Sequence, residues 1–306
     1  MCAIAGLLFK NGKRRNFNMT TGAALTEILD ATLHRGPDSA GWAIYREPLE
    51  AGTLRIRFLV SDGDKRAGEI EKIHQILAAQ KAEIIREESL GCTYGVFVRY
   101  TGDILTLTHA AEKQVKMISV GASLDIIKDV GQPLDLSPRY GIRDFNGAHG
   151  IAHIRLATES GVHPDTAHPF WACGFADIAT VHNGQLTNYW IMRRRLERRG
   201  MAFQTENDTE LIAVYLAYRM SQGATLEDAL KTSLEDLDGT FSYLVATKDA
   251  IGYAKDKLAA KPMVKYEDED MIAISSEEVG LNRLFPGRAL PTTEPAPLTY
   301  GLWSRS

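Results

Sequence analysis

The chain has 306 residues, of which 44% are hydrophobic and 24% charged, a composition typical of a globular protein and unlike that of a disordered one. Its 35 basic and 39 acidic residues give a net charge of −4, which argues against a protein whose main task is to hold nucleic acid. No apolar run approaches the ~20 residues of a membrane-spanning helix, and the N-terminal apolar stretch precedes its positive charges, the reverse of a secretory signal.

The first part of the chain predicts a strand, a helix and a second strand before the pattern changes. We expect the strand over 2–9, the amphipathic helix over 22–34, a turn over 34–41 and the second strand over 42–45. From about 53 to 140 the segments predict an inserted α+β lobe, closed by a Gly- and Pro-rich stretch. Its expected elements are a helix over 66–88 and strands over 54–60, 95–100, 104–109 and 115–121.

The second part of the chain predicts a similar mixture of strands and helices. Strands are expected over 150–158, 178–184, 241–248, 250–255, 263–266 and 271–276, and helices over 188–199, around 211–218 and over 225–236. Four prolines after Phe285 predict an extended tail. The expected organisation is therefore one domain over 2–285, interrupted at about 53–140, and a tail over 286–306.

The three cysteines differ in what they suggest. Cys2, Cys92 and Cys173 are an odd number, far apart and without a CxxC pair, which argues against a disulfide framework or a zinc site and predicts a reducing cytoplasm. If Met1 is removed, Cys2 becomes the N-terminal residue, and its own α-amine, with an ordinary pKa of about 7.7–8.0, can accept the thiol proton. The alternative is that Cys2 only fills space at the start of a strand.

Six motifs occur in one order along the chain. They are MCAIAG at 1–6, HRGPD at 34–38, HIRLAT at 153–158, AHPF at 167–170, HNGQLTN at 182–188 and NDTE at 207–210. Together they resemble the class-II glutamine amidotransferases, whose nucleophile is an N-terminal cysteine. The segments DGTFSYLVATKD and IAISSEEVGL resemble the closing strands of that family. The resemblance covers about 1–45 and 148–285. It implies an α+β, N-terminal-nucleophile hydrolase fold, an αββα sandwich of two antiparallel sheets between helix layers, with the inserted lobe added.

The resemblance also implies which residues perform the chemistry. Cys2 is the expected nucleophile, and the Asn183 side chain with the Gly184 backbone N–H would form the oxyanion hole. Arg155 would bind the α-carboxylate of L-glutamine through its planar fork, and Asp208 would bind the α-ammonium. The alternatives are an ordinary surface ion pair for Arg155, a helix cap for Asp208 and a hairpin turn for the Asn-Gly pair.

Other residues of the motifs have weaker assignments. Thr158 matches a substrate contact, although the following Glu159 departs from family members that have a histidine there. Arg35 is expected to brace the site, Asn188 to lie near the nucleophile, and His168 to have a structural or a catalytic role. The remaining histidines lack metal-ligand spacing, so no metal and no other cofactor is expected on this chain.

The activity that the resemblance implies is hydrolysis of the glutamine side-chain amide, with the ammonia used by a synthase. Because no second catalytic domain follows the family-like part, we expect a subunit of a complex with a glutamate-synthase-like partner. The resemblance is greatest to the amidotransferase subunit of N-methylglutamate synthase (methylamine–glutamate N-methyltransferase), whose partner subunits would hold a flavin and an iron–sulfur cluster. The alternatives are a free-standing amidohydrolase that acts on another amide and a non-catalytic regulatory subunit.

Overall fold

A sheet of six antiparallel strands forms one half of the central sandwich in this computed structural model, which describes residues 2–12, 17–111, 114–157 and 161–305. The strand order is β13-β14-β1-β8-β2-β7. Its strands are β1 (Ala3–Phe9), β2 (Ser39–Tyr45), β7 (Leu124–Val130), β8 (His149–Arg155), β13 (Val264–Glu267) and β14 (Met271–Ser275).

A second antiparallel sheet of five strands packs on the first, with β10, β11 and β12 in contact with β1. The strand order is β15-β12-β11-β10-β9. Its strands are β9 (Phe170–Trp171), β10 (Ala179–Leu186), β11 (Gly239–Ala246), β12 (Ala250–Lys255) and β15 (Thr299–Ser304).

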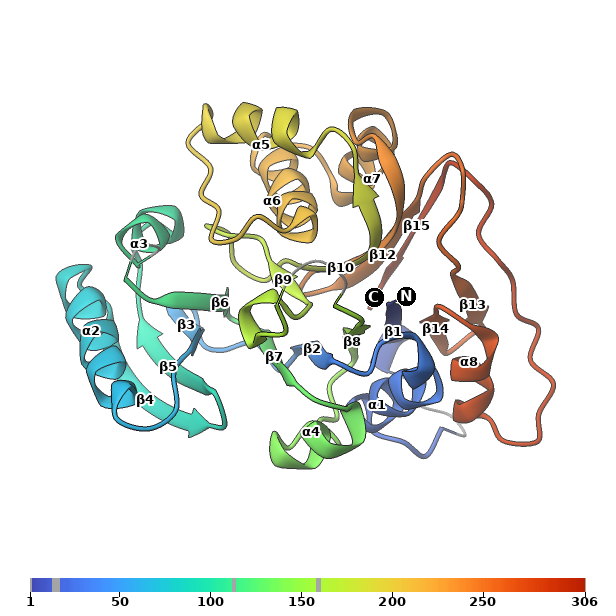
Figure 1. The fold of residues 1–306 in the computed structure, drawn as a ribbon, viewed down its shortest axis with the longest axis horizontal. Coiled ribbons are helices and arrows are strands. Elements are labelled where there is room, and N and C mark those ends of the chain that lie inside the picture. The colour runs from blue at the N-terminus through green and yellow to red at the C-terminus, as the bar shows by residue number, and fades with distance from the viewer. Residues whose placement is uncertain (1, 13–16, 112–113, 158–160, 306) are drawn as a thin grey trace.

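Helices cover the outer face of each sheet (Figure 1). On the six-stranded sheet, α1 (Thr21–Ala31) packs on β1 and β8, beside α4 (Pro133–Arg139) and α8 (Glu278–Leu284). On the five-stranded sheet lie α6 (Asp208–Ser221) and α7 (Leu226–Asp236), with α5 (Tyr189–Glu197) against α6. This is the α+β, four-layered arrangement that the sequence predicts. None of the described helices combines the length and the apolar character needed to cross a membrane.

Strand β1 is buried at every residue. Ile4 and Leu8 belong to the core between the sheets, whereas Ala5 and Leu7 pack in the core beneath α1. A side chain on Gly6 would lie 2.9 Å from Leu244 of the opposite sheet. Because both faces are covered, the strand is apolar throughout instead of alternating with polar residues.

The inserted lobe has its own four-stranded antiparallel sheet, with the order β4-β5-β3-β6 (left of the view in Figure 1). Two helices accompany it. The elements are β3 (Thr53–Leu59), α2 (Lys65–Ala79), β4 (Glu83–Leu90), β5 (Thr93–Arg99), α3 (Ile104–Ala111) and β6 (Lys116–Gly121).

Two elements of the lobe differ from the sequence prediction. The helix expected over 66–88 ends at Ala79, where Lys81 takes a positive φ of 59°, and the chain then returns as strand β4. The strand expected over 104–109 is helix α3. The spacing of its apolar residues fits both a helix and a strand. The Asp103 carboxylate accepts the Thr106 N–H at 2.7 Å and so starts a helix.

Three segments outside the lobe's sheet also differ. Residues 124–130, placed within the insertion by the sequence, form edge strand β7 of the six-stranded sheet. The motif IAISSEEVGL, expected as a closing strand, is strand β14 followed by α8. The C-terminal segment is not only an extended tail, because β15 pairs with β12 from Ala250 to Lys255 and forms the edge of the five-stranded sheet.

A buried ion pair joins the lobe to the sandwich. Arg57 of β3 donates from Nε to Asp125 Oδ1 of β7 at 2.6 Å and from Nη2 to Oδ2 at 3.1 Å. Both side chains are 1% exposed. Burial alone would raise the pKa of Asp125, but the charge and hydrogen bonds of Arg57 lower it to about 2. The carboxylate is therefore ionised and depends on Arg57 for compensation.

Replacing Arg57 with methionine leaves the buried Asp125 charge without its main partner. We expect Arg57→Met to lower the free energy of unfolding by about 3–5 kcal/mol, measured by urea denaturation. The control is Arg99→Met in the same lobe, where the ion pair with Glu83 is 64% and 66% exposed and the expected change is within about 1 kcal/mol. Equal losses in the two variants would contradict the anchoring role of the buried pair.

Candidate active site

A cavity of about 340 Å³ opens beside the start of β1, where the end of β8 and the middle of β10 come together. Most of the residues that the sequence singled out line it. The lining residues are Cys2, Arg35, Arg155, Leu156, His168, His182, Asn183, Gly184, Asn207, Asp208 and Lys261. The register explains part of this convergence, because Ala3 pairs with Ile154 and so sets Cys2 beside Arg155.

Cys2 is held at its carbonyl and at its thiol. The Leu156 N–H donates to Cys2 Sγ at 3.4 Å. Arg35 donates from Nε to the Cys2 carbonyl at 2.9 Å and forms an ion pair with Glu277. The half-buried thiol therefore faces the cavity from a fixed position.

The HRGPD turn is locked to the end of β8. A Cβ on Gly36 would come within 2.8 Å of the Arg155 backbone, so only glycine permits this approach. The Asp38 carboxylate accepts the Ala157 N–H at 2.8 Å. The turn thus supports the site through backbone contacts.

The Asn183 side chain is oriented by three neighbours. Its Nδ2 donates to the Cys2 carbonyl at 3.2 Å and to Ser276 Oγ at 3.1 Å. Its Oδ1 lies 3.2 Å from His153 Nε2. Burial lowers the pKa of His153 to about 3, against the hydrogen bonds that raise it, so the ring is neutral and can donate to that oxygen.

Gly184 follows inside the same strand, and its conformation excludes a side chain. It has a φ of +142°, and a Cβ there would lie 1.9 Å from the Thr240 carbonyl oxygen of β11. The alternative interpretation of the Asn-Gly pair as a hairpin turn is wrong, because β10 runs through both residues from Ala179 to Leu186.

Asp208 supplies a fixed negative charge at the start of α6. Its Oδ1 lies 3.3 Å from His182 Nδ1, and its Oδ2 accepts the Leu186 N–H at 3.1 Å. Burial would raise the pKa of Asp208, but the His182 interaction and the backbone N–H donors outweigh it and lower the pKa. The helix cap expected of Asp208 is made by Asn207 instead, whose side chain accepts the Thr209 N–H at 2.9 Å.

Arg155 supplies the opposite charge. It is the last residue of β8, is 9% exposed, and donates from Nη1 to Thr166 Oγ1 at 3.1 Å. The buried position is unlike that of an ordinary surface ion pair. The cavity therefore holds a cation and an anion that are each fixed by hydrogen bonds.

His168 packs as a neutral ring against the cavity wall. It stacks on His153 with ring centroids 4.1 Å apart, and its Nδ1 lies 3.4 Å from Thr209 Oγ1. Burial, together with the neighbouring cations, holds the pKa of His168 well below its usual value. These contacts favour the structural interpretation of His168.

Two further expected site residues remain, Thr158 and Asn188. Thr158 lies outside the described residues. Asn188 does not line the cavity as the described residues define it, so its expected place near the nucleophile stays a prediction. Its side chain donates to the Asp236 carbonyl at 2.9 Å and accepts the Asp238 N–H at 3.1 Å, which ties the end of β10 to the α7–β11 connection.

Four lining residues were missed by the sequence analysis. Leu156, His182 and Asn207 lie inside the motifs HIRLAT, HNGQLTN and NDTE, so the motifs themselves were the available signal. Lys261 has no such signal. The Ser242 hydroxyl donates to its carbonyl at 2.8 Å, and Ser242 is the strand partner of Asn183. Its ammonium makes no hydrogen bond or ion pair with any residue that the structure describes, which leaves a cation free to meet an anionic group.

The cavity thus offers a thiol, a fixed cation, a fixed anion and an orientated amide. A free amino acid has an α-carboxylate and an α-ammonium that match the two fixed charges. Within the described ranges, no group of three or more His, Cys, Asp or Glu side chains is arranged to hold a metal ion.

Comparison with known proteins identifies the family. The model of the "Glutamine amidotransferase domain" family matches residues 153–283. A protein of Methanothermobacter thermautotrophicus, classed by name among the glutamine amidotransferases, is 38% identical over 290 residues, 93% of this chain and 94% of the relative. The glutamine amidotransferase-like protein GlxB of Rhizobium meliloti is 35% identical over 303 residues, 99% of this chain and 98% of the relative.

A solved structure shows the same fold. The glutamine phosphoribosylpyrophosphate amidotransferase of B. subtilis aligns with a TM-score of 0.60 and 18% identity, over 100% of this chain and 49% of that chain. The N-terminal-nucleophile fold that the sequence resemblance implies is therefore confirmed. With two relatives above 30% identity that it covers almost completely, the chain belongs to the glutamine amidotransferase family.

Proposed function

We propose that this chain hydrolyses the side-chain amide of L-glutamine through a thioester on Cys2 and passes the ammonia to a separate synthase subunit. The observation that supports this most is the gathering of Cys2, Arg155, Asn183, Gly184 and Asp208 around one cavity. Each is of the chemical type that the reaction needs: a nucleophile, two charges for the amino acid and two donors for an oxyanion.

The two fixed charges would orient the substrate. Arg155 binds the α-carboxylate through its guanidinium fork, and Asp208 binds the α-ammonium. With both ends of the amino acid held, the side-chain amide extends toward the Cys2 thiol. This pairing favours free glutamine over the other amides that a free-standing amidohydrolase would take.

The reaction then proceeds by covalent catalysis. After removal of Met1, the α-amine of Cys2 takes the thiol proton, and the thiolate attacks the amide carbon. The C–N bond breaks, and ammonia leaves with the proton from the α-amine. A water molecule, deprotonated by the same amine, attacks the γ-glutamyl thioester and releases glutamate and the free thiol.

The tetrahedral intermediate needs donors for its oxyanion. Asn183 Nδ2 and the Gly184 N–H are proposed for this role. In the structure Asn183 Nδ2 donates to the Cys2 carbonyl and to Ser276, so one of these bonds must be exchanged for the oxyanion. His153 retains Asn183 Oδ1 during this exchange and keeps the amide orientated.

Mass spectrometry tests the nucleophile. The glutamine analogue 6-diazo-5-oxo-norleucine is expected to add once, to Cys2, in protein from which Met1 has been removed. Cys173 is buried and so out of reach of the reagent, and burial raises the pKa of Cys92 to about 11, so Cys92 forms too little thiolate at neutral pH to compete. Labelling of Cys92 or Cys173, or full activity with Met1 retained, would overturn the assignment of nucleophile or base.

Steady-state kinetics separates binding from chemistry. Arg155→Ala is expected mainly to raise KM for glutamine, because the α-carboxylate is held in both the ground and the transition state. Asn183→Ala is expected to lower kcat by roughly 10²–10³, the usual loss of one oxyanion donor. Asn188→Ala, with its side-chain bonds outside the cavity, is the matched control and leaves both constants close to wild type. A change in KM alone for Asn183→Ala would exclude the oxyanion role.

A separate ammonia acceptor is supported by the lengths of the relatives. This chain covers 94% and 98% of the two relatives named above, but only 49% of the B. subtilis amidotransferase. We propose a glutamate-synthase-like acceptor of the N-methylglutamate synthase type, with any flavin and iron–sulfur cluster on that partner. The retained Cys2, Asn183 and Gly184 argue against a non-catalytic regulatory subunit.

Titration with the partner tests this coupling. Uncoupled turnover would destroy glutamine, so we expect low glutaminase activity in the isolated chain and a rise when the partner is added. A tenfold activation requires the partner to prefer the active state by about 1.4 kcal/mol. Glutamate release is measured at saturating glutamine. Full activity without a partner, and no complex in size-exclusion chromatography, would favour a free-standing glutaminase.

A further inference from the structure

The short segment 165–169 contacts the active site through its side chains and a buried lysine through its carbonyls. Thr166 bonds to Arg155, and His168 lines the cavity. The carbonyls of the alternate residues Asp165, Ala167 and Pro169 accept hydrogen bonds from one ammonium, that of Lys128, at 3.5, 2.7 and 3.2 Å. The Lys128 ammonium therefore holds the backbone on both sides of Thr166 and of His168.

Lys128 is placed for this role by the sheet. It lies on β7, is 2% exposed, and its Nζ sits 4.2 Å from the centre of the Phe170 ring. Its strand partner on β2 is Gly41, where a Cβ would lie 2.1 Å from the His168 carbonyl oxygen. The absence of a side chain at Gly41 lets the segment lie directly on the sheet, over Lys128.

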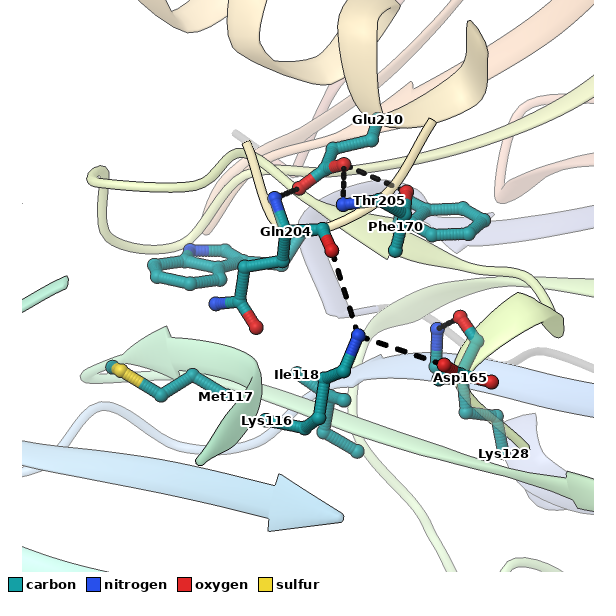
Figure 2. Close-up of a pocket in the computed structure, with 10 residues that line it drawn as sticks. Lys116, Met117, Ile118, Lys128, Asp165, Phe170, Gln204, Thr205 and Glu210 are labelled. Carbon is teal, nitrogen blue, oxygen red and sulfur yellow. Dashed lines mark hydrogen bonds and ion pairs between the residues drawn. The ribbon is translucent and has the colours of Figure 1, made fainter. Parts of the chain in front are cut away.

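A second lysine, which together with Lys128 lines a separate pocket, connects the same segment with the loop that carries Gln204. Figure 2 shows Lys116 of β6 pointing between two loops, with its Nζ 3.6 Å from Asp165 Oδ2 and 3.5 Å from the Gln204 carbonyl. The buried Glu210 carboxylate accepts the N–H groups of Gln204 and Thr205, each at 2.8 Å. This loop leads directly into Asn207 and Asp208.

Charge at Lys128 is costly, and the surroundings compensate for it. Burial lowers the pKa of Lys128 to about 7, while the charges of Asp165 and Glu210 oppose that effect and the charge of Lys116 adds to it. The three carbonyls and the aromatic face replace the water that the ammonium has lost. The same contacts hold the segment, so the buried charge and the cavity wall stabilise each other.

We propose that Lys128 and Lys116 are positioning residues for glutamine binding. Lys128 sets the wall that orients Arg155, and Lys116 ties that wall and the Asp208 loop to the inserted lobe. The inference rests on the proposed function, since it assigns Arg155 and Asp208 to the two ends of glutamine. Neither lysine lines the cavity as the described residues define it, so both act through other residues.

The kinetic test uses Lys128→Met, which keeps the length of the side chain and removes the donor. We expect KM for glutamine to rise about 10- to 100-fold, as for the loss of hydrogen bonds by a charged group, with a much smaller change in kcat. Lys116→Met, at a half-exposed site, is expected to raise KM less. The control is Lys265→Met on β13, at the opposite edge of the same sheet, where the ammonium lies 5.5 Å from the Trp303 ring. It should not alter KM.

A second measurement separates positioning from damage to the nucleophile. Alkylation of Cys2 by iodoacetamide needs no amino-acid binding, whereas 6-diazo-5-oxo-norleucine needs the Arg155 contact. Lys128→Met is expected to slow the second reaction and leave the first at its wild-type rate. An equal fall in both rates, or a fall in kcat without a rise in KM, would overturn the proposal.

Hydrogen exchange provides a readout that does not depend on activity. Backbone amides of residues 163–170 should exchange faster in Lys128→Met, and those of 204–208 faster in Lys116→Met, while Lys265→Met changes neither. Unchanged exchange in folded variants would overturn the positioning role of the two lysines, whether or not the wild-type protein hydrolyses glutamine. If the wild-type protein hydrolyses no glutamine, the proposed function is refuted, and the exchange measurement still tests the positioning role. If Lys128→Met does not fold, Lys116→Met decides.

Discussion

The position of the nucleophile depends on one constraint, the burial of β1 on both faces and both edges. Its residues pair with β14 on one side and with β8 on the other, while α1 and the five-stranded sheet cover its faces. A strand enclosed in this way cannot shift its register without moving apolar side chains into the wrong layer. Cys2, one residue before the strand, takes its place in the cavity from this register.

Several polar side chains around Cys2 are uncharged, and Asp208 is held by more than one contact. Three histidines lie near the nucleophile, but burial keeps His153 and His168 neutral, so these rings orient neighbours without adding charge. The charge of Asp208 is compensated by His182 and backbone N–H groups. Under the proposed function, a zwitterionic ligand would therefore meet Arg155 at one end and Asp208 at the other.

The residues of the motifs could be found from the sequence, whereas residues brought in by long-range packing could not. Cys2, Arg155, Asn183 and Asp208 lie in motifs with a resemblance to a known family, and they converge on one cavity. Lys128 gave no signal, because a lysine in a strand is usually exposed. It is buried by a segment about forty residues later in the chain, the bond to Ala167 spanning 39 positions. Helix α3 was missed because the spacing of its apolar residues fits both a helix and a strand. The Asp103 contact at its start favours the helix.

The enclosure of β1 also delays its complete pairing during protein synthesis. The Ile4 N–H donates to Ser276, 272 positions later in the chain, so the edge of β1 toward β14 cannot close until the last part of the protein has been made. At about 5–20 residues per second, the intervening residues take roughly 14–54 s to synthesise. During that interval β1 can pair with β8, but its β14 edge stays open. The removal of Met1 that the proposed mechanism requires would have this interval in which to occur, before β14 closes the strand beside Cys2.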